Sequence, residues 1–287
     1  MIWQMRKSIR PINLRRIIEL ASIAIDEGKI TENLVSKKLN TSQKQARELL
    51  RELSRMKLLK VELEYFIPTE KSREILYYYE RENWEGIHNF LFMNYDFYNI
   101  FITKLSKGPP RLKDELLQEL SHIEDIVYNN TAIDILCDWA ERLGQVQRNL
   151  YNNKYYLLRK EEITHQHFLK VIEECYSNLN VKTRPGIKII YVEIARLREL
   201  VCEYLKIERD IFDKFLEHLF LKNIGRMELS GAPLTTSAKK SPTSLKFLER
   251  GEKENILSPQ YKTIREGRGL EVNGKLYHYI GIFGKLG

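Results

Sequence analysis

The sequence has few cysteines and no long apolar run, and each absence excludes a class of protein. Three of the 287 residues are cysteines, Cys137, Cys175 and Cys202, and they are far apart in the chain. An odd number of widely spaced thiols supports neither a disulfide framework nor a thiolate zinc site, so we expect all three to be buried in a helical core. No apolar run approaches the ~18 residues of a membrane-spanning helix, and no signal-peptide core is present. These absences predict a cytoplasmic protein without a membrane partner.

The sequence also lacks the motifs of common catalytic and metal sites. Residues 269–275 have the spacing of a phosphate-binding loop, but Leu276 replaces the hydroxyl residue that would bind magnesium, and the stretch fits a hairpin turn better. His165 and His167 are two residues apart, so they point in different directions on a helix and make a poor metal pair. We therefore expect no cofactor, no metal and no enzymatic activity. An enzyme whose site is assembled from distant segments is a third hypothesis without a supporting motif.

The chain is basic, and its charge is unevenly distributed. It has 47 Lys and Arg against 39 Asp and Glu, a formal net charge of +8. Residues 1–82 have a net charge of +5, residues 83–160 of −1 and residues 161–287 of +4. A positive balance favours a polyanionic partner. We expect nucleic acid to contact the two ends of the chain, while the middle is structural.

The clearest local pattern lies in residues 29–60, which read as two short helices joined by a tight turn. Lys44, Arg47, Arg51 and Arg55 follow one another at spacings of three and four residues. This spacing places all four along one side of a helix, and leucines fill the opposite side. The pattern predicts an amphipathic helix with one basic face.

An alternating run at residues 60–67 follows this helix and predicts a single strand. Helix, turn, basic helix and strand resemble a winged helix-turn-helix domain, and residues 12–67 carry the resemblance best. The family implies that the helix beginning near Ser42 enters the major groove of double-stranded DNA, while the wing contacts phosphate or the minor groove. On this resemblance and the basic face, we assign DNA contacts to Ser42, Gln43, Lys44, Arg47, Arg51, Arg55 and Lys60.

The alternative for this helix is a solvated surface on which Glu48 and Glu52 pair with neighbouring cations. Between Lys37 and Lys60 the chain has eight basic and two acidic residues. That excess is larger than a balanced surface helix requires. It favours contact with DNA over the solvated surface.

Two further segments resemble weaker copies of the same order of elements. Residues 83–105 predict one aromatic helix that forms a core or a dimer interface, and the later helix of this segment is acidic, which indicates a packing or dimerisation unit. The third segment ends in a hairpin at residues 273–274 and contains a basic insertion at 230–268. In this insertion we expect DNA contacts from Lys239, Lys240, Lys246, Arg265 and Arg268.

The sequence therefore predicts a mainly α protein with small β-hairpin wings, in the α+β class. Its tandem winged-helix-like domains would span residues 1–82, 83–160 and 161–287. The leading hypothesis is a non-enzymatic double-stranded DNA-binding protein, with transcriptional regulation and a replication, partition or chromatin role left open. The alternative is a winged-helix adaptor or scaffold that mediates protein–protein interaction in a larger complex. Self-association as a homodimer is compatible with both hypotheses.

Overall fold

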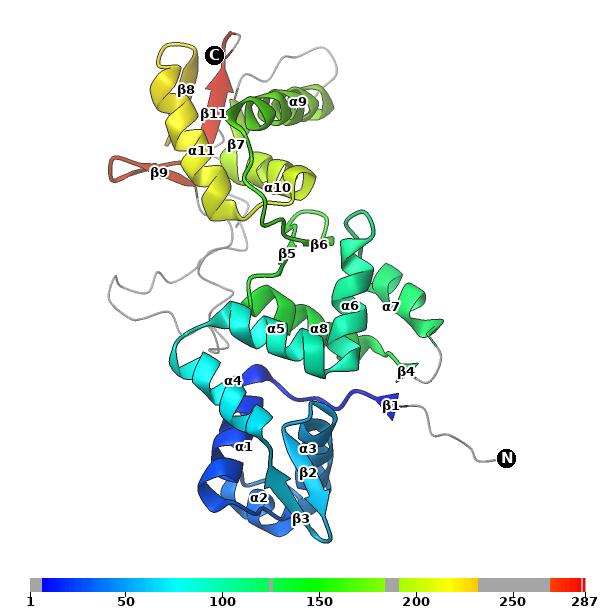
Figure 1. Cartoon of the computed structure of the whole chain (residues 1–287). Helices are drawn as coiled ribbons and strands as arrows, with labels where there is room; N and C mark the ends of the chain where they lie inside the picture. The colour runs from blue at the N-terminus through cyan, green and yellow to red at the C-terminus, as the bar shows by residue number, and fades with distance from the viewer. Residues whose placement is uncertain (1–6, 124–125, 184–190, 232–268, 285, 287) are drawn as a thin grey trace. The chain divides into compact units, whose positions relative to one another are not determined.

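The computed structural model is mainly helical, with short strands that pair mostly antiparallel (Figure 1). The expected α+β class is confirmed. The structure describes residues 7–123, 126–183, 191–231, 269–284 and 286. Within this part of the chain, no helix is long and apolar enough to cross a membrane.

The chain divides into two compact units, and its division does not follow a single boundary. The first unit contains residues 1–148 and 154–157, and the second contains residues 149–153 and 158–287. The short loop 149–153 therefore belongs to the second unit, although the strands on either side of it belong to the first. The sequence-based division into three domains stays a prediction.

The first unit begins with helices whose starts are fixed by side-chain caps. Asn13 Oδ1 accepts a hydrogen bond from the Arg16 backbone N–H, and Thr31 Oγ1 accepts one from Leu34. Such caps satisfy backbone donors that have no partner within the helix. The elements of this part are β1 (Lys7–Ser8), α1 (Leu14–Glu27), α2 (Glu32–Lys38), α3 (Gln43–Arg55), β2 (Leu59–Glu62), β3 (Tyr65–Pro68) and α4 (Glu70–Glu80).

The single strand predicted at residues 60–67 is wrong, because the structure has a complete hairpin there. Strands β2 and β3 pair antiparallel from Leu59↔Pro68 to Glu62↔Tyr65. The turn between them begins at Leu63, whose φ of 56° lies in the left-handed region. The turn lacks the Asn or Gly that usually marks this geometry in a sequence, so the alternating pattern hid it.

The second part of the first unit is built around buried aromatic side chains. Its elements are α5 (Trp84–Asn94), α6 (Asp96–Ser106), α7 (Lys113–Ser121), β4 (Ile126–Val127), α8 (Asn130–Arg142), β5 (Val146–Arg148) and β6 (Tyr155–Leu157). Tyr95, Tyr98, Phe101 and Trp139 are almost completely buried. The aromatic run therefore forms a core within the chain, as one of the two sequence interpretations predicted.

The single aromatic helix predicted for residues 83–105 is wrong, because the helix is interrupted at Tyr95. That residue is extended, with φ −132° and ψ 103°. On either side of it, amide side chains bond to backbone carbonyls: Asn94 Nδ2 to Phe90 O at 2.9 Å, and Asn99 Nδ2 to Phe92 O at 2.8 Å. Asn side chains compete in this way with the regular helical hydrogen bonds.

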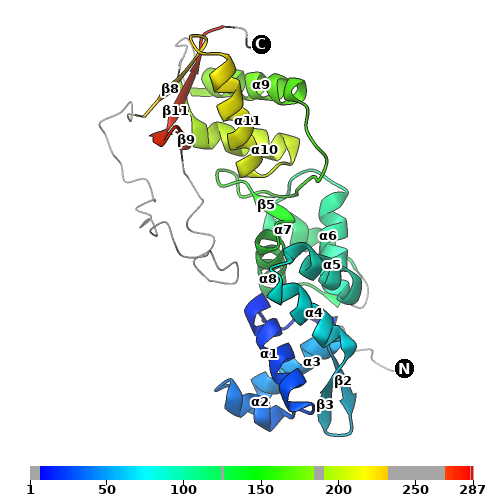
Figure 2. The same cartoon turned by 60° about the vertical axis from the view of Figure 1, so that its left-hand side comes forward.

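The second unit combines three helices with two small sheets. Its elements are α9 (His165–Thr183), β7 (Tyr191–Glu193), α10 (Ile194–Leu205), α11 (Arg209–Lys222), β8 (Met227–Ser230), β9 (Leu270–Val272), β10 (Lys275–Tyr277) and β11 (Tyr279–Ile282). Helices α9 and α10 lie side by side (Figures 1 and 2). Strand β11 pairs antiparallel with both β7 and β8. The hairpin predicted at Asn273-Gly274 is confirmed by β9 and β10, and both turn residues have positive φ.

A buried polar network holds the loop 149–153 within the second unit. Asn149 is fully buried, and its side-chain amide donates to the Glu199 backbone carbonyl at 3.3 Å and to the Glu203 carboxylate. The Glu199 carboxylate accepts a hydrogen bond from the Leu150 backbone N–H at 3.0 Å. Buried polar groups are stable only when such partners are present.

The predicted burial of the three cysteines is confirmed. Cys137, Cys175 and Cys202 are free and buried, on α8, α9 and α10. Burial raises the pKa of the Cys175 thiol to about 11, and it also raises that of Cys202. Thiols with such pKa values stay protonated at neutral pH, so they pack as small apolar side chains.

Candidate nucleic-acid interface

Helix α3 presents four of the predicted DNA-contacting side chains on one exposed face. Gln43, Lys44, Arg47 and Arg51 are all exposed. The leucines on the opposite face are buried, so the helix is fixed to the core of the unit on that side. A rigid helix with one polar, basic face has the shape and the side chains required to enter a DNA groove.

Ser42 has a structural role at the beginning of α3. Its hydroxyl oxygen accepts a hydrogen bond from the Gln45 backbone N–H, and the Gln45 side-chain oxygen accepts one from the Ser42 backbone N–H, both at 3.2 Å. This reciprocal pair is a capping box. It fixes the first turn of the helix, where Gln43 and Lys44 are exposed. A DNA contact by Ser42 itself stays a prediction.

Arg47 is paired with an acidic residue that the sequence did not indicate. Its Nε lies 2.8 Å from Glu32 Oε1, on α2. The hydrogen bond from Arg47 lowers the pKa of Glu32, and the charge of Arg51 lowers it further. Because Glu32 and Arg47 are 15 residues apart, no helical spacing connects them.

Lys44 and Arg51 are here called the uncompensated cations of this face because they form no ion pair among the described residues, although the charge of Arg51 also acts on Glu32. The alternative interpretation offered Glu48 as a partner, but Glu48 lies 3.7 Å from Arg10. Exposed cations without an internal partner are available to phosphate oxygens.

Arg55 differs from the other basic residues of α3, because its partners are a backbone carbonyl and a fully buried carboxylate. Its Nη1 donates to the Ser8 carbonyl oxygen at 2.7 Å and lies 3.0 Å from Glu52 Oε2. Glu52 is fully buried, and it also accepts a hydrogen bond from the Tyr95 hydroxyl. Burial raises the pKa of Glu52, while Tyr95, Arg55 and the Arg10 backbone N–H oppose the rise. These contacts anchor α3 in the unit, and the DNA contact assigned to Arg55 stays a prediction.

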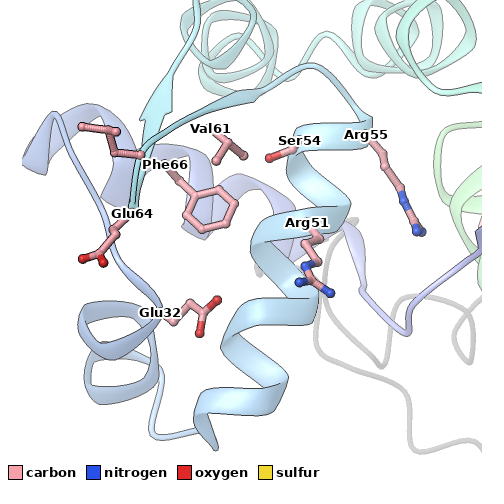
Figure 3. Close-up of a pocket in the computed structure, with 8 residues that line it drawn as sticks. Glu32, Arg51, Ser54, Arg55, Val61, Glu64 and Phe66 are labelled. Atoms are coloured by element: carbon pink, nitrogen blue, oxygen red, sulfur yellow. The ribbon is translucent and has the colours of Figure 1, made fainter.

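An open groove lies between α3 and the β2–β3 hairpin (Figure 3). Its volume is about 430 Å³. Phe66 extends from the hairpin toward the helix, and Arg51 and Ser54 line the opposite wall. The groove therefore combines apolar side chains with cations, a hydroxyl and the carboxylates of Glu32 and Glu64.

The tip of the hairpin is acidic and apolar. Lys60 pairs with Glu62 at 2.5 Å, so its charge is compensated. Leu63 and Glu64 follow in the turn, and both are exposed. Carboxylates repel phosphate, so the hairpin tip is a poor phosphate contact, although the resemblance implies one there. The available positive charge of this region lies on α3.

The remaining described residues add no second chemical site of the kinds considered. Among them, no three His, Cys, Asp or Glu side chains gather as potential metal ligands.

The predicted DNA contacts of the basic insertion, Lys239, Lys240, Lys246, Arg265 and Arg268, lie outside the described residues. Comparison with protein-family models gives no match, and comparison with curated proteins gives none either. The candidate interface is therefore defined by the geometry of α3.

Proposed function

We propose that residues 12–67 form the winged-helix part of a domain spanning residues 1–82, that it binds double-stranded DNA through α3, and that the chain is a non-enzymatic DNA-binding protein. The observation that supports this proposal is the exposed face of α3. It combines two uncompensated cations, Lys44 and Arg51, with Gln43 and Arg47. The following segments, with their own helices and hairpins, are proposed as weaker copies of the same domain.

The chemistry of the face divides between affinity and sequence reading. Lys44 and Arg51 neutralise phosphates and release condensed counterions, so binding weakens as salt rises. Gln43 lies in the first turn and can bond bidentately to adenine, and Arg47 can do so to guanine once it leaves Glu32. The ion pair with Glu32 holds Arg47 along the face of α3. DNA must therefore compete with the Glu32 carboxylate for Arg47.

The proposal is tested by removing the two uncompensated cations. Fluorescence anisotropy would follow the binding of a labelled mixed-sequence duplex at several salt concentrations. We expect Lys44→Ala with Arg51→Ala to weaken binding and to reduce the slope of log K against log salt by about 2, because about one counterion is released per phosphate contact.

The matched control is Arg73→Ala with Lys107→Ala, which removes the same charge from exposed positions on α4 and after α6. If both double variants bind DNA equally, the proposed face is not the interface. If the unchanged protein does not bind DNA even at low salt, DNA binding itself is refuted.

A protein-interaction role is the second candidate function, and the hairpin favours it. Val61 is 60% exposed and Leu63 is 96% exposed. Large apolar side chains on a hairpin tip are typical of contact with another macromolecule. An adaptor would bind a protein partner through this surface and show no salt-dependent affinity for DNA.

A further inference from the structure

Strand β2 is an edge strand whose backbone is available for pairing. The other strand of the hairpin is covered, because Ile30 exchanges two backbone hydrogen bonds with Phe66, each 2.9 Å long. Within the described residues, the opposite edge of β2 pairs with no strand. An exposed edge of this kind is a template for a strand from another chain.

The hydrogen-bonding pattern identifies which residues of β2 face outward. The Thr69 N–H donates to the Leu58 carbonyl at 2.9 Å, so the backbone groups of Leu58 face the strand β3 side. Backbone groups alternate in direction along an antiparallel strand, so Lys60 also faces β3, whereas Leu59 and Val61 direct their N–H and C=O groups outward. The centre of the free edge is therefore Val61.

In residues 59–63, Leu-Lys-Val-Glu-Leu, the apolar and charged positions are symmetric about Val61, and the two charges are opposite in sign. We propose that β2 pairs antiparallel with β2 of a second copy of this chain, with a two-fold axis at Val61. In this register Lys60 lies opposite Glu62 of the second copy, and Glu62 opposite its Lys60. Opposite charges placed across an antiparallel pair stabilise it, and like charges destabilise it. The strand is thus complementary to itself in one orientation only.

The apolar side chains of the strand support the same occupant. Val61, on β2, and Leu63, in the turn that follows it, line the groove described above and are largely exposed. Pairing about Val61 brings the two Val61 side chains together and removes apolar surface from water. Edge strands that are protected against pairing repel copies of themselves, for example through lysines, whereas this strand alternates charge so that a copy is attracted.

The sequence placed the dimer interface elsewhere, on the aromatic run of residues 83–105. Most of the aromatic side chains of that run are buried within the first unit. A pair of four-residue strands is small, and we expect a weak, concentration-dependent dimer. The inference does not depend on DNA binding, and it is tested without DNA.

The decisive experiment exchanges the two charges of β2. Sedimentation equilibrium would give the dimer dissociation constant of the full chain, of Lys60→Glu, of Glu62→Lys and of the double exchange. Each single variant places like charges opposite each other twice, so we expect the dissociation constant to rise about tenfold or more. The double exchange restores opposite charges, and we expect it to restore the original value.

The two single variants change the net charge in opposite directions, so a bulk effect of charge could not weaken both. Both side chains are more than half exposed, so folding is not at risk. A monomer at all concentrations, single variants that dimerise normally, or a double exchange that fails to recover would each overturn the proposal.

A second measurement uses the two-fold axis directly. In the proposed register Val61 faces its own counterpart, with Cα atoms about 5.5 Å apart, which a disulfide can bridge. We expect Val61→Cys to form a covalent dimer under mild oxidation, while Glu64→Cys, which is also exposed but lies away from the axis, does so much less. Equal cross-linking of the two variants, or none at Val61→Cys, would refute the register.

Discussion

The buried hydrogen bond between Tyr95 and Glu52 provides the sharpest test of how α3 is anchored. Tyr95 lies at the break between α5 and α6, and its hydroxyl donates to a carboxylate that is fully buried on α3. Tyr95→Phe removes only this hydroxyl and keeps the aromatic ring in the core. Glu52 then retains Arg55 and the Arg10 backbone N–H, but it loses one donor that water cannot replace.

The expected loss of stability depends on the charge of Glu52. A hydrogen bond to a charged group contributes about 1.5–3 kcal/mol, and one between neutral groups about 0.5–1.5 kcal/mol. Burial raises the pKa of Glu52, so the carboxyl is neutral below its folded pKa and charged above it. The stability that the neutral carboxyl contributes is fully present below its unfolded pKa and is lost as pH rises through the folded pKa. Tyr95→Phe should therefore cost more at pH values above the folded pKa of Glu52 than below it.

Urea unfolding followed by tryptophan fluorescence would measure this loss. The three tryptophans, Trp3, Trp84 and Trp139, all lie in the sequence of the first unit, so the signal reports that unit alone. Tyr128→Phe is the control, because its hydroxyl donates to the neutral Phe97 carbonyl at 3.1 Å and its loss should not vary with pH. A Tyr95→Phe variant as stable as the unchanged protein at every pH would refute the anchoring role.

Two further variants test the cores of the units. Arg209→Ala should destabilise the second unit by about 3–5 kcal/mol, because Arg209 donates twice to Glu199, which is 2% exposed and would lose this partner of opposite sign. Faster hydrogen exchange in α10 would show this, and unchanged exchange would contradict it. Leu50→Ala should destabilise the first unit by about 2–5 kcal/mol, since Leu50 is fully buried on α3. Its unfolding is read by tryptophan fluorescence, and a loss below ~1 kcal/mol would mean that the core collapses around the gap.

The features that the sequence predicted well depend on neighbouring residues. The helix predicted to begin near Ser42 does so because the Ser42 hydroxyl oxygen bonds to a backbone N–H three residues later. The turn at Asn273-Gly274 is visible because only a few residue types tolerate its positive φ. The basic face of α3 follows from spacing alone, and its exposure in the structure agrees with that spacing.

The features that the sequence did not reveal depend on residues far apart in the chain. Leu63 adopts a positive φ without the usual turn residues, and the surrounding strands impose it. The partners of the α3 side chains are equally distant: Glu32 is 15 residues from Arg47, and Tyr95 is 43 residues from Glu52. Periodicity cannot identify such pairs, yet they determine which cations of α3 remain outside ion pairs.

The loop 149–153 has a consequence for how the chain can be divided. Because this loop belongs to the second unit and the strands on either side belong to the first, the chain passes from one unit to the other three times. A cut after residue 148 would deprive the first unit of β6, and a cut after residue 157 would deprive the second unit of Asn149, the buried partner of Glu203. No single cut therefore yields two complete parts.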